Sequence, residues 1–361
     1  MESMTIIALA TVLVLLYSLI KWKYTYWERR GVPFIKPNIP FGNVFQIGGK
    51  FHTSELFLNF YKKMKGKGTF IGLYSFQNPV VMAMDIELIK HIMIKDFNSF
   101  VNRGVYHNEK DDPLSGHLFA IEGQKWRSLR TKLTPTFTSG KMKFMYPTMV
   151  DVAKEFKSTV DTILKENNGS ADIEIKDLLA RFTTDVIGVC AFGIECNSLK
   201  DPETEFRQMG RKIFTVQRGR LFKFLFTSAF PSFSRAIGLR VTRPQIEKFF
   251  MGIVRETVNF RQEKKIHRND FMDLLIKLLN EKDGINMNQI SAQALIFFIA
   301  GFETSSTAMT FAFYELAKNP DIQEKARREI ETVLEKHNGE FTYEAMIEMT
   351  YVDQIINGKY N

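Results

Sequence analysis

The sequence predicts a mostly α-helical protein with a small β patch. Apolar residues recur at helical spacing over most of the chain after residue 85, and two short β-rich runs lie between residues 69 and 84. The chain has 361 residues, 45% of them hydrophobic and 25% charged, which is enough for one large core or two smaller ones. This composition excludes a disordered chain and a collagen-like repeat.

The first expected element is a membrane-anchoring helix over residues 1–21. No charged side chain occurs from Met4 to Ile20, and a helix of these 17 residues would span about 26 Å, close to the thickness of a bilayer core. Aromatic and basic residues follow, as at a membrane interface: Lys21, Trp22, Lys23, Tyr24, Tyr26, Trp27, Arg29 and Arg30. The positive-inside rule places the body on the cytosolic side. The alternative is a cleaved signal peptide, but the basic start and the small-residue cleavage site are missing.

Residues 22–50 are expected to form a basic, aromatic and proline-containing hinge, and residues 51–361 a single body. The hinge cannot be one continuous helix because it contains Gly31, Pro33, Pro37 and Pro40.

Within the body, the two β-rich runs on either side of Asn78-Pro79 predict a hairpin. Helical spacing predicts helices over 85–95, 122–133, 141–166, 176–191, 243–265, 270–281, 288–318 and 320–336.

Five phenylalanines crowd residues 221–233, which is a liability on an aqueous surface. They belong either to the core or to a lipid contact, and the anchor favours lipid. The net charge of +9 allows a nucleic acid, an anionic membrane or an acidic protein as partner. A membrane anchor argues against nucleic acid. Two cysteines, Cys190 and Cys196, are too few for a disulfide framework and indicate a reducing compartment.

Common catalytic motifs are missing from the sequence: it contains no Walker loop, dinucleotide GxGxxG, HExxH or GxSxG. The segment from Ala300 to Ser306, AGFETSS, is chemically unusual because it lies inside a long apolar helix. A glycine there costs about 1 kcal/mol relative to alanine, and a carboxylate among apolar residues needs a partner. Small Ala300 and Gly301 would let a flat cofactor approach, while Glu303 and Thr304 could relay protons. The alternative is a solvent-facing glutamate with hydroxyls bonded to carbonyls one turn back.

A second segment, Trp126 to Arg130, places an indole and a guanidinium four residues apart on one helical face. Together they could hold a carboxylate. Taken alone, such a pair more often means surface packing or a cation–π contact.

With these segments, the chain resembles the haem-thiolate monooxygenases of the cytochrome P-450 family, and most of all their insect microsomal detoxification branch. The resemblance runs from the anchor to Asn357. It is seen in the segments FVNRG at 100–104, DDPLSGHLF at 111–119, WRSLR at 126–130, LTPTFTSGK at 133–141, CAFG at 190–193 and AGFETS at 300–305.

The resemblance implies roles for individual residues. Thr304 and Glu303 match the oxygen-activation motif as its hydroxyl and proton-supplying acid, next to Ala300 and Gly301. Trp126 and Arg130 match the helix that holds a haem propionate, and Arg103 is a second propionate partner. The residues expected to line the substrate pocket are Tyr106, Leu118, Phe119, Phe222, Phe297 and Phe298. The residues that resemble a docking face for an acidic flavin reductase are Lys125, Arg127, Lys132, Lys141 and Lys143.

The chain also departs from the family's pattern. Family members continue past this point into a Glu-x-x-Arg helix and a cysteine loop whose thiolate binds iron, and neither follows Asn357 in residues 1–361. The chain is expected to hold the amino-terminal two-thirds to three-quarters of the fold plus one transmembrane helix. No metal ligand is assigned, and Cys190 and Cys196 are interpreted as packing residues. As given, the chain is expected to have little or no monooxygenase activity.

The resemblance implies a haem-dependent monooxygenase that acts on apolar small molecules such as xenobiotics, plant toxins, insecticides or endogenous lipophiles. Its expected partners are NADPH-cytochrome reductase and the lipid bilayer, with no nucleic acid, at the endoplasmic reticulum membrane. Two alternatives stay open: a non-catalytic, membrane-anchored binder of lipophilic ligands or reductase, and a helical membrane protein unrelated to haem.

Overall fold

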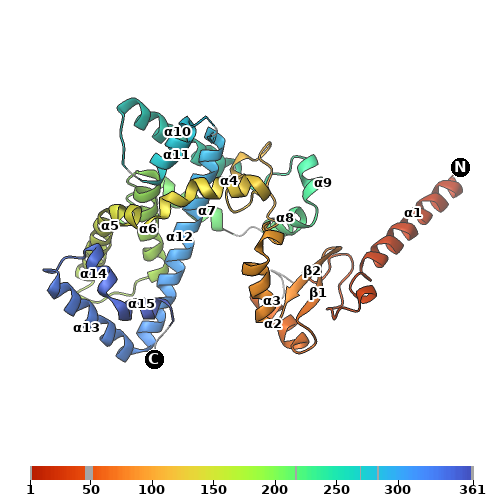
Figure 1. Cartoon of the computed structure of the whole chain (residues 1–361), viewed down its shortest axis with the longest axis horizontal. Helices are drawn as coiled ribbons and strands as arrows, with labels where there is room; N and C mark the ends of the chain where they lie inside the picture. Colours follow the sequence, from red (N-terminus) through yellow and green to blue (C-terminus); the bar gives the residue numbers. More distant parts are fainter. Residues whose placement is uncertain (1, 45–51, 216–217, 269, 283, 359–361) are drawn as a thin grey trace. The chain divides into compact units, whose positions relative to one another are not determined.

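The computed structural model describes residues 2–44, 52–215, 218–268, 270–282 and 284–358 (Figure 1). The chain forms two compact units. Unit 1 comprises Met1–Tyr106 and Val216–Val241, and unit 2 comprises His107–Thr215 and Thr242–Asn361. The predicted division into anchor, hinge and body stays a prediction. Its boundary at residues 50 and 51 lies outside the described residues.

Unit 1 begins with the predicted apolar helix and contains the small sheet. Its helices and strands are α1 (Glu2–Lys23), α2 (Thr53–Met64), β1 (Phe70–Ser75), β2 (Asn78–Ala83), α3 (Ile86–Lys90), α8 (Arg218–Ala229) and α9 (Pro231–Ala236). The predicted hinge, residues 22–50, is described up to residue 44. Its first two residues belong to α1, and residues 24–44 hold one 3₁₀ turn, Glu28–Arg30, and no α-helix.

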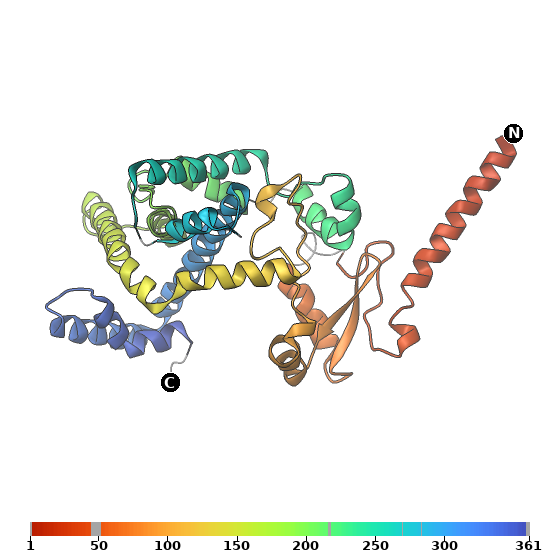
Figure 2. The same cartoon turned by 45° about the horizontal axis from the view of Figure 1, so that its top comes forward.

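The hairpin is confirmed, but its turn is two residues earlier than the predicted Asn78-Pro79. Strands β1 and β2 pair antiparallel, as the two orange arrows in Figure 2 show. In this pairing Tyr74 lies opposite Pro79 and Ser75 opposite Asn78. The turn is formed by Phe76 and Gln77, and Phe76 has a φ of 51°. Pro79 is tolerated within β2 because this strand is an edge strand of a two-stranded sheet.

The phenylalanine-rich segment forms α8 and α9, which divide at Phe230 and Pro231. Phe230 contacts Phe76 at 5.7 Å between ring centroids, and Ala229 O accepts a hydrogen bond from Asn78 Nδ2. Three of the five rings are more than half exposed: Phe222, Phe224 and Phe233. The segment therefore has both a packed and an exposed face.

Unit 2 is helical in its described residues. Its α-helices are α4 (Gly123–Leu133), α5 (Ser139–Glu166), α6 (Ile175–Ile187), α7 (Glu205–Phe214), α10 (Pro244–Lys264), α11 (Phe271–Asn280), α12 (Met287–Lys318), α13 (Pro320–Lys336), α14 (Tyr343–Glu348) and α15 (Thr350–Ile356). The long α12 lies beside α6, as Figure 1 shows, and its amino-terminal half is the centre of the main core. The predicted helices of this unit are present, and α7, α14 and α15 were not predicted.

The core of unit 2 also contains a buried ion cluster. Arg261 of α10 donates from Nη1 to Asp270 Oδ1 at 2.7 Å and to Asp273 Oδ1 at 2.8 Å. Its Nη2 donates to Asp270 Oδ2 at 2.6 Å and to the carbonyl of Phe192 at 3.3 Å. The cluster joins α10, the start of α11 and the residues after α6. Gly193 follows with a φ of 67°, and a Cβ there would lie 2.0 Å from Arg261 Nη2.

Among the residues that the structure describes, two helices are long and apolar enough to cross a membrane. One lies in the segment Met4–Arg30 and is not buried, and the other is α12, which is partly buried. Because α12 supplies core residues to unit 2, its length reflects a core helix. The first matches the predicted anchor.

Candidate functional site

The AGFETSS segment lies in the middle of α12, which is one continuous α-helix from Met287 to Lys318. A capping box fixes its start: Asn286 accepts from Gln289 N, and Gln289 accepts from Asn286 N. Helical spacing puts Ala300, Thr304 and Ala308 on one face, and all three are exposed. The motif therefore presents a strip of small side chains on an otherwise core-forming helix.

Gly301 faces α6. A Cβ at this position would lie 2.8 Å from Ile187 Cδ1. The glycine thus allows close packing of α12 against α6, which offsets its conformational cost in mid-helix. A role for Gly301 beside a cofactor stays a prediction.

The hydroxyls of the motif bond one turn back, as the alternative reading of the sequence expected. Thr304 Oγ1 donates to the carbonyl of Ala300, and Ser306 Oγ donates to that of Phe302 at 3.0 Å. Thr183 Oγ1 of α6 also donates to Phe302 O, at 2.9 Å. Ser306 is buried, whereas Thr304 and Ser305 are exposed, and Thr304 is the exposed hydroxyl on the face of Ala300 and Ala308.

Glu303 is neither enclosed by apolar groups nor directed simply into solvent. Its Oε1 lies 3.3 Å from Lys176 Nζ, and its side chain is 29% exposed. Both residues line a pocket of about 500 Å³ between α6, α7 and α12. The pocket is lined by Glu174, Lys176, Asp177, Ala180, Arg207, Arg211, Phe214, Thr215, Phe302 and Glu303. Glu303 therefore belongs to a charged pocket, whereas Thr304 belongs to the strip of small residues.

Asp177 is the anionic centre of this pocket. Burial raises the pKa of its carboxyl, but hydrogen bonds from Arg181, Arg207 and Arg211 outweigh burial and lower it to about 2. Arg207 is almost fully buried, and its guanidinium lies 5.2 Å from the centre of the Phe302 ring. The aspartate and its arginines thus hold α7 against α6 and α12.

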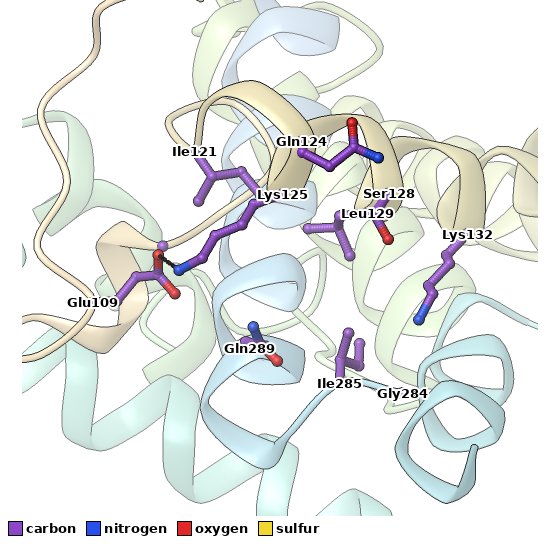
Figure 3. A pocket seen from close by; sticks show the side chains of 11 residues that line it. Glu109, Ile121, Gln124, Lys125, Ser128, Leu129, Lys132, Gly284, Ile285 and Gln289 are labelled. Carbon is purple, nitrogen blue, oxygen red and sulfur yellow. Dashed lines mark hydrogen bonds and ion pairs between the residues drawn. The ribbon is translucent and has the colours of Figure 1, made fainter. Parts of the chain in front are cut away.

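Trp126 and Arg130 share one face of α4, as predicted. Trp126 is half-buried against the main core, and Arg130 is exposed. The opposite face of α4, with Gln124, Ser128 and Lys132, lines a second pocket of about 350 Å³ (Figure 3). That pocket is therefore separate from the face that holds Trp126 and Arg130.

Figure 3 shows how the second pocket is built. Lys125 reaches from α4 to Glu109, with Nζ 3.1 Å from Oε1. Ile285, just before α12, and Gln289, in its first turn, lie across the pocket from α4. The pocket's lining combines the charged Lys125–Glu109 pair with the apolar side chains of Ile121, Leu129 and Ile285.

The loop before α4 is tied to α12 by Gln293. Its Oε1 accepts from Leu118 N at 2.8 Å, and its Nε2 donates to Gly116 O at 3.4 Å. Leu118 packs against the main core, whereas Phe119 is 51% exposed. His117 is largely buried, and burial lowers its pKa to about 4, so its ring is neutral at pH 7.

Phe297 and Phe298 make core contacts. Phe298 is fully buried and lies 5.0 Å from Phe206 and 5.3 Å from Phe302 between ring centroids. Phe297 stacks on Phe271 at 3.6 Å and on Phe137 at 5.4 Å. These contacts give both rings a packing role, and a substrate contact stays a prediction.

Three predicted site residues lie in unit 1 and are described there. Arg103 is exposed. Tyr106 is buried, and its hydroxyl donates to Leu239 O at 2.7 Å. Phe222 is 55% exposed and lies 6.2 Å from Phe76 between ring centroids.

Neither cysteine suits a thiolate ligand. Burial raises the pKa of the Cys190 thiol to about 11 and that of Cys196 further still. Cys196 packs so closely that a Cβ on Gly188 would lie 2.2 Å from its Sγ. Within the described residues, no group of three or more His, Cys, Asp or Glu could hold a metal. Cys196 belongs to the main core and Cys190 is partly buried, and the interpretation of both as packing residues stays a prediction.

Sequence reasoning missed Lys176, Arg207 and Gln293. Gln293 carried a detectable signal, since a glutamine inside an apolar helix needs a buried partner. Lys176 and Arg207 carried none, because their partners lie on other helices.

A model of the cytochrome P450 family matches residues 32–357. The chain is 47% identical over 364 residues to the probable cytochrome P450 6a21 of Drosophila melanogaster, covering 98% of this chain and 72% of that protein. It is 42% identical over 362 residues to cytochrome P450 6A1 of Musca domestica, covering 98% and 70%.

The chain therefore belongs to the cytochrome P450 family, and its similar proteins are insect members. This confirms the family, the insect branch and the mostly helical fold with its small sheet. The share of the relatives' length also agrees with the expected two-thirds to three-quarters.

Haem is the cofactor of this family, and it fits residues of unit 2. The exposed small side chains of Ala300, Thr304 and Ala308 leave a flat surface on α12 that a planar group can cover. Trp126 and Arg130 supply an indole donor and a cation for a propionate.

Proposed function

We propose that this protein contributes the substrate-binding and proton-delivering side of a haem monooxygenase for apolar small molecules. The observation that supports this most is that Glu303 and Thr304 lie on different sides of α12. Glu303 occupies a charged pocket with Lys176, while the adjacent Thr304 lies on the exposed strip of small residues. An acid open to water and an alcohol facing the cofactor side are the two parts of a proton relay.

Haem, when bound, supplies the reductive activation of O₂ that this family uses. Arg130 and Trp126 would hold its propionate, since a guanidinium recognises carboxylates strongly. Thr304 can release the proton that it now donates to Ala300 O and accept another from Glu303. Glu303 in turn regains its proton from water in the pocket. These residues therefore orient the group and move protons toward it.

The proposed substrates are apolar, among them plant toxins, insecticides and other xenobiotics. Leu118 and Phe119, next to the Gln293 tether, would contact the substrate, with Phe297 behind them. The exposed rings of Phe222, Phe224 and Phe233 are suited to lipid contact, by which lipophilic molecules reach the protein.

The proposed electron donor is NADPH-cytochrome reductase. Lys125, Arg127 and Lys132 belong to α4, and Lys141 and Lys143 to the first turns of α5. A net charge of +9 would attract an acidic flavoprotein. The apolar α1, with basic residues in its last turn, supports anchoring in the endoplasmic reticulum membrane with the body on the cytosolic side.

Haem retention tests the cofactor assignment. In the haem-loaded enzyme, Arg130→Ala and Trp126→Phe should each weaken haem binding by about tenfold or more, because each removes a hydrogen-bond donor to a propionate. Gln124→Ala, on the opposite face of α4, is the control and should bind haem like the wild type. Equal haem retention in all three variants would refute the assignment.

A second candidate is a non-catalytic, membrane-anchored binder of lipophilic ligands. One observation favours it: burial raises the pKa of the thiol both at the partly buried Cys190 and at the buried Cys196. Tight binding of hydrophobic probes by haem-free protein would support it, whereas aggregation of that protein would count against it.

A further inference from the structure

The second pocket, between α4 and the start of α12, has no part in the proposed proton relay (Figure 3). Its volume of about 350 Å³ is at the lower end of the range of about 300–1,000 Å³ that small-molecule sites occupy. Three buried apolar side chains line it: Ile121 and Leu129 on the side of α4, and Ile285 across from them. The pocket can therefore cover the apolar body of a small ligand.

The charges of the lining favour an anion. Among the described residues, the lining contains two ammonium groups, those of Lys125 and Lys132, and one carboxylate, that of Glu109. Lys125 Nζ lies 3.1 Å from Glu109 Oε1, and a Cβ on Gly116 would lie 2.7 Å from Glu109 Cγ. The carboxylate is thus paired and held against the wall of the pocket. One positive charge remains in excess in the lining, which suits a monoanion better than a dianion.

Gln289 brings an unused hydrogen-bond donor to this pocket. Its Oε1 accepts from Asn286 N at 3.0 Å in the capping box of α12. A backbone N–H can only donate, so this contact identifies the oxygen of the side-chain amide and leaves Nε2 for another acceptor. Nε2 donates to no described residue, and Ser128 Oγ on α4 has no hydrogen-bond partner among them either. Two donors on opposite walls of the pocket are therefore available to an acceptor.

We propose that the second pocket binds a small amphipathic monocarboxylate. The carboxylate accepts hydrogen bonds from Ser128 Oγ and Gln289 Nε2, beside the ammonium group of Lys132. The apolar body of the ligand covers Leu129 and Ile285. Hydrogen bonds to a charged acceptor are stronger than those between neutral groups, so a carboxylate gains more from these donors than an alcohol does. The proposal is independent of the monooxygenase function, because no residue of this pocket is assigned to haem, substrate or proton delivery.

The test measures the binding of phenylpropionate to the 361-residue chain in lipid nanodiscs by isothermal titration calorimetry. Two analogues separate the parts of the ligand: phenylpropanol has the same apolar body without the charge, and acetate has the charge without that body. Empty nanodiscs give the contribution of the lipid. Phenylpropionate should bind more tightly than either analogue, by about fivefold or more.

Gln289→Glu separates the donor from the helix cap. A glutamate at this position still caps α12, since its carboxylate accepts from Asn286 N, but it replaces the donor to the ligand by a negative charge. It should weaken phenylpropionate binding by about tenfold or more, with an unchanged thermal unfolding midpoint. Ser128→Ala, at an exposed position, should weaken binding by about threefold. The matched control is Lys110→Met, which removes an exposed charge next to Glu109 but outside the lining, and it should bind like the wild type.

The proposal fails if the wild type does not bind phenylpropionate, or if phenylpropanol binds equally well. Binding that is unchanged in both Gln289→Glu and Ser128→Ala would place the ligand elsewhere and would also overturn it. An equal loss in Lys110→Met would indicate attraction by net charge alone, without recognition in the pocket, and would count against it in the same way. Failure of the proposed function would be seen separately as missing haem binding, which this calorimetry does not involve.

Discussion

Replacing Arg261 by methionine should destabilise unit 2 strongly. The side chain of Arg261 is 3% exposed, and those of Asp270 and Asp273 are each 6% exposed. Water can therefore replace few of the hydrogen bonds that the guanidinium donates to the two carboxylates. Removing the cation leaves two buried carboxylates without the guanidinium that neutralises them, for which the expected cost is about 3–5 kcal/mol. That is a large fraction of the 5–15 kcal/mol typical of a folded protein.

Urea unfolding followed by tryptophan fluorescence measures this loss. Trp126 packs against the same core as α10 and α11, so its emission reports on their release. Arg255→Met, an exposed position on α10, is the control and should change the free energy of unfolding by less than about 0.5 kcal/mol.

A third variant separates the unpaired charges from the lost contacts. Arg261→Met with Asp270→Asn and Asp273→Asn leaves no buried charge at the cluster, and asparagine at 270 still caps α11. It should recover much of the stability lost in Arg261→Met. A cost below 1 kcal/mol for Arg261→Met, or no recovery in the triple variant, would refute the assignment of the loss to unpaired charge.

Three further predictions concern the site. Asp177→Asn should cost about 1–2 kcal/mol at pH 7, because the wild-type pKa of about 2 lies below its ordinary 3.8. This difference should disappear as the pH falls through 4 toward 2, as urea unfolding at each pH will show. Gly301→Val should destabilise the protein by about 1–3 kcal/mol through overlap with Ile187, and adding Ile187→Ala should restore part of the thermal midpoint. The reduced, carbon monoxide-treated 361-residue chain should show no thiolate-type Soret band, because burial raises the pKa of the thiols of both Cys190 and Cys196; a clear band would contradict this.

Helical spacing was sufficient to find the long helices of unit 2. The predicted 288–318 differs from α12 by one residue at its start, and 320–336 agrees with α13. Both have clear boundaries: the Asn286 and Gln289 capping box, and Asn319-Pro320. The short α14 and α15 were missed because six or seven residues are too few to show a period.

The candidate site was predicted in part. The sequence identified Glu303 and Thr304 as chemically unusual and placed Trp126 beside Arg130 on one face. It left open whether Glu303 meets solvent, a partner or a cofactor. The partner of Glu303 is Lys176, which is 127 positions away in the chain. No local sequence pattern predicts that Lys176 Nζ of α6 lies 3.3 Å from Glu303 Oε1 of α12.

By itself, the sequence determined the apolar first helix, the helical class and the family, because these depend on composition, spacing along one element and motifs of neighbouring residues. The tertiary structure decided that Gly301 packs on Ile187, that Phe298 is core, and that Glu303 and Thr304 serve different sides of α12. These facts depend on which helices pack together, and packing is set by side chains remote in the chain that meet only after folding.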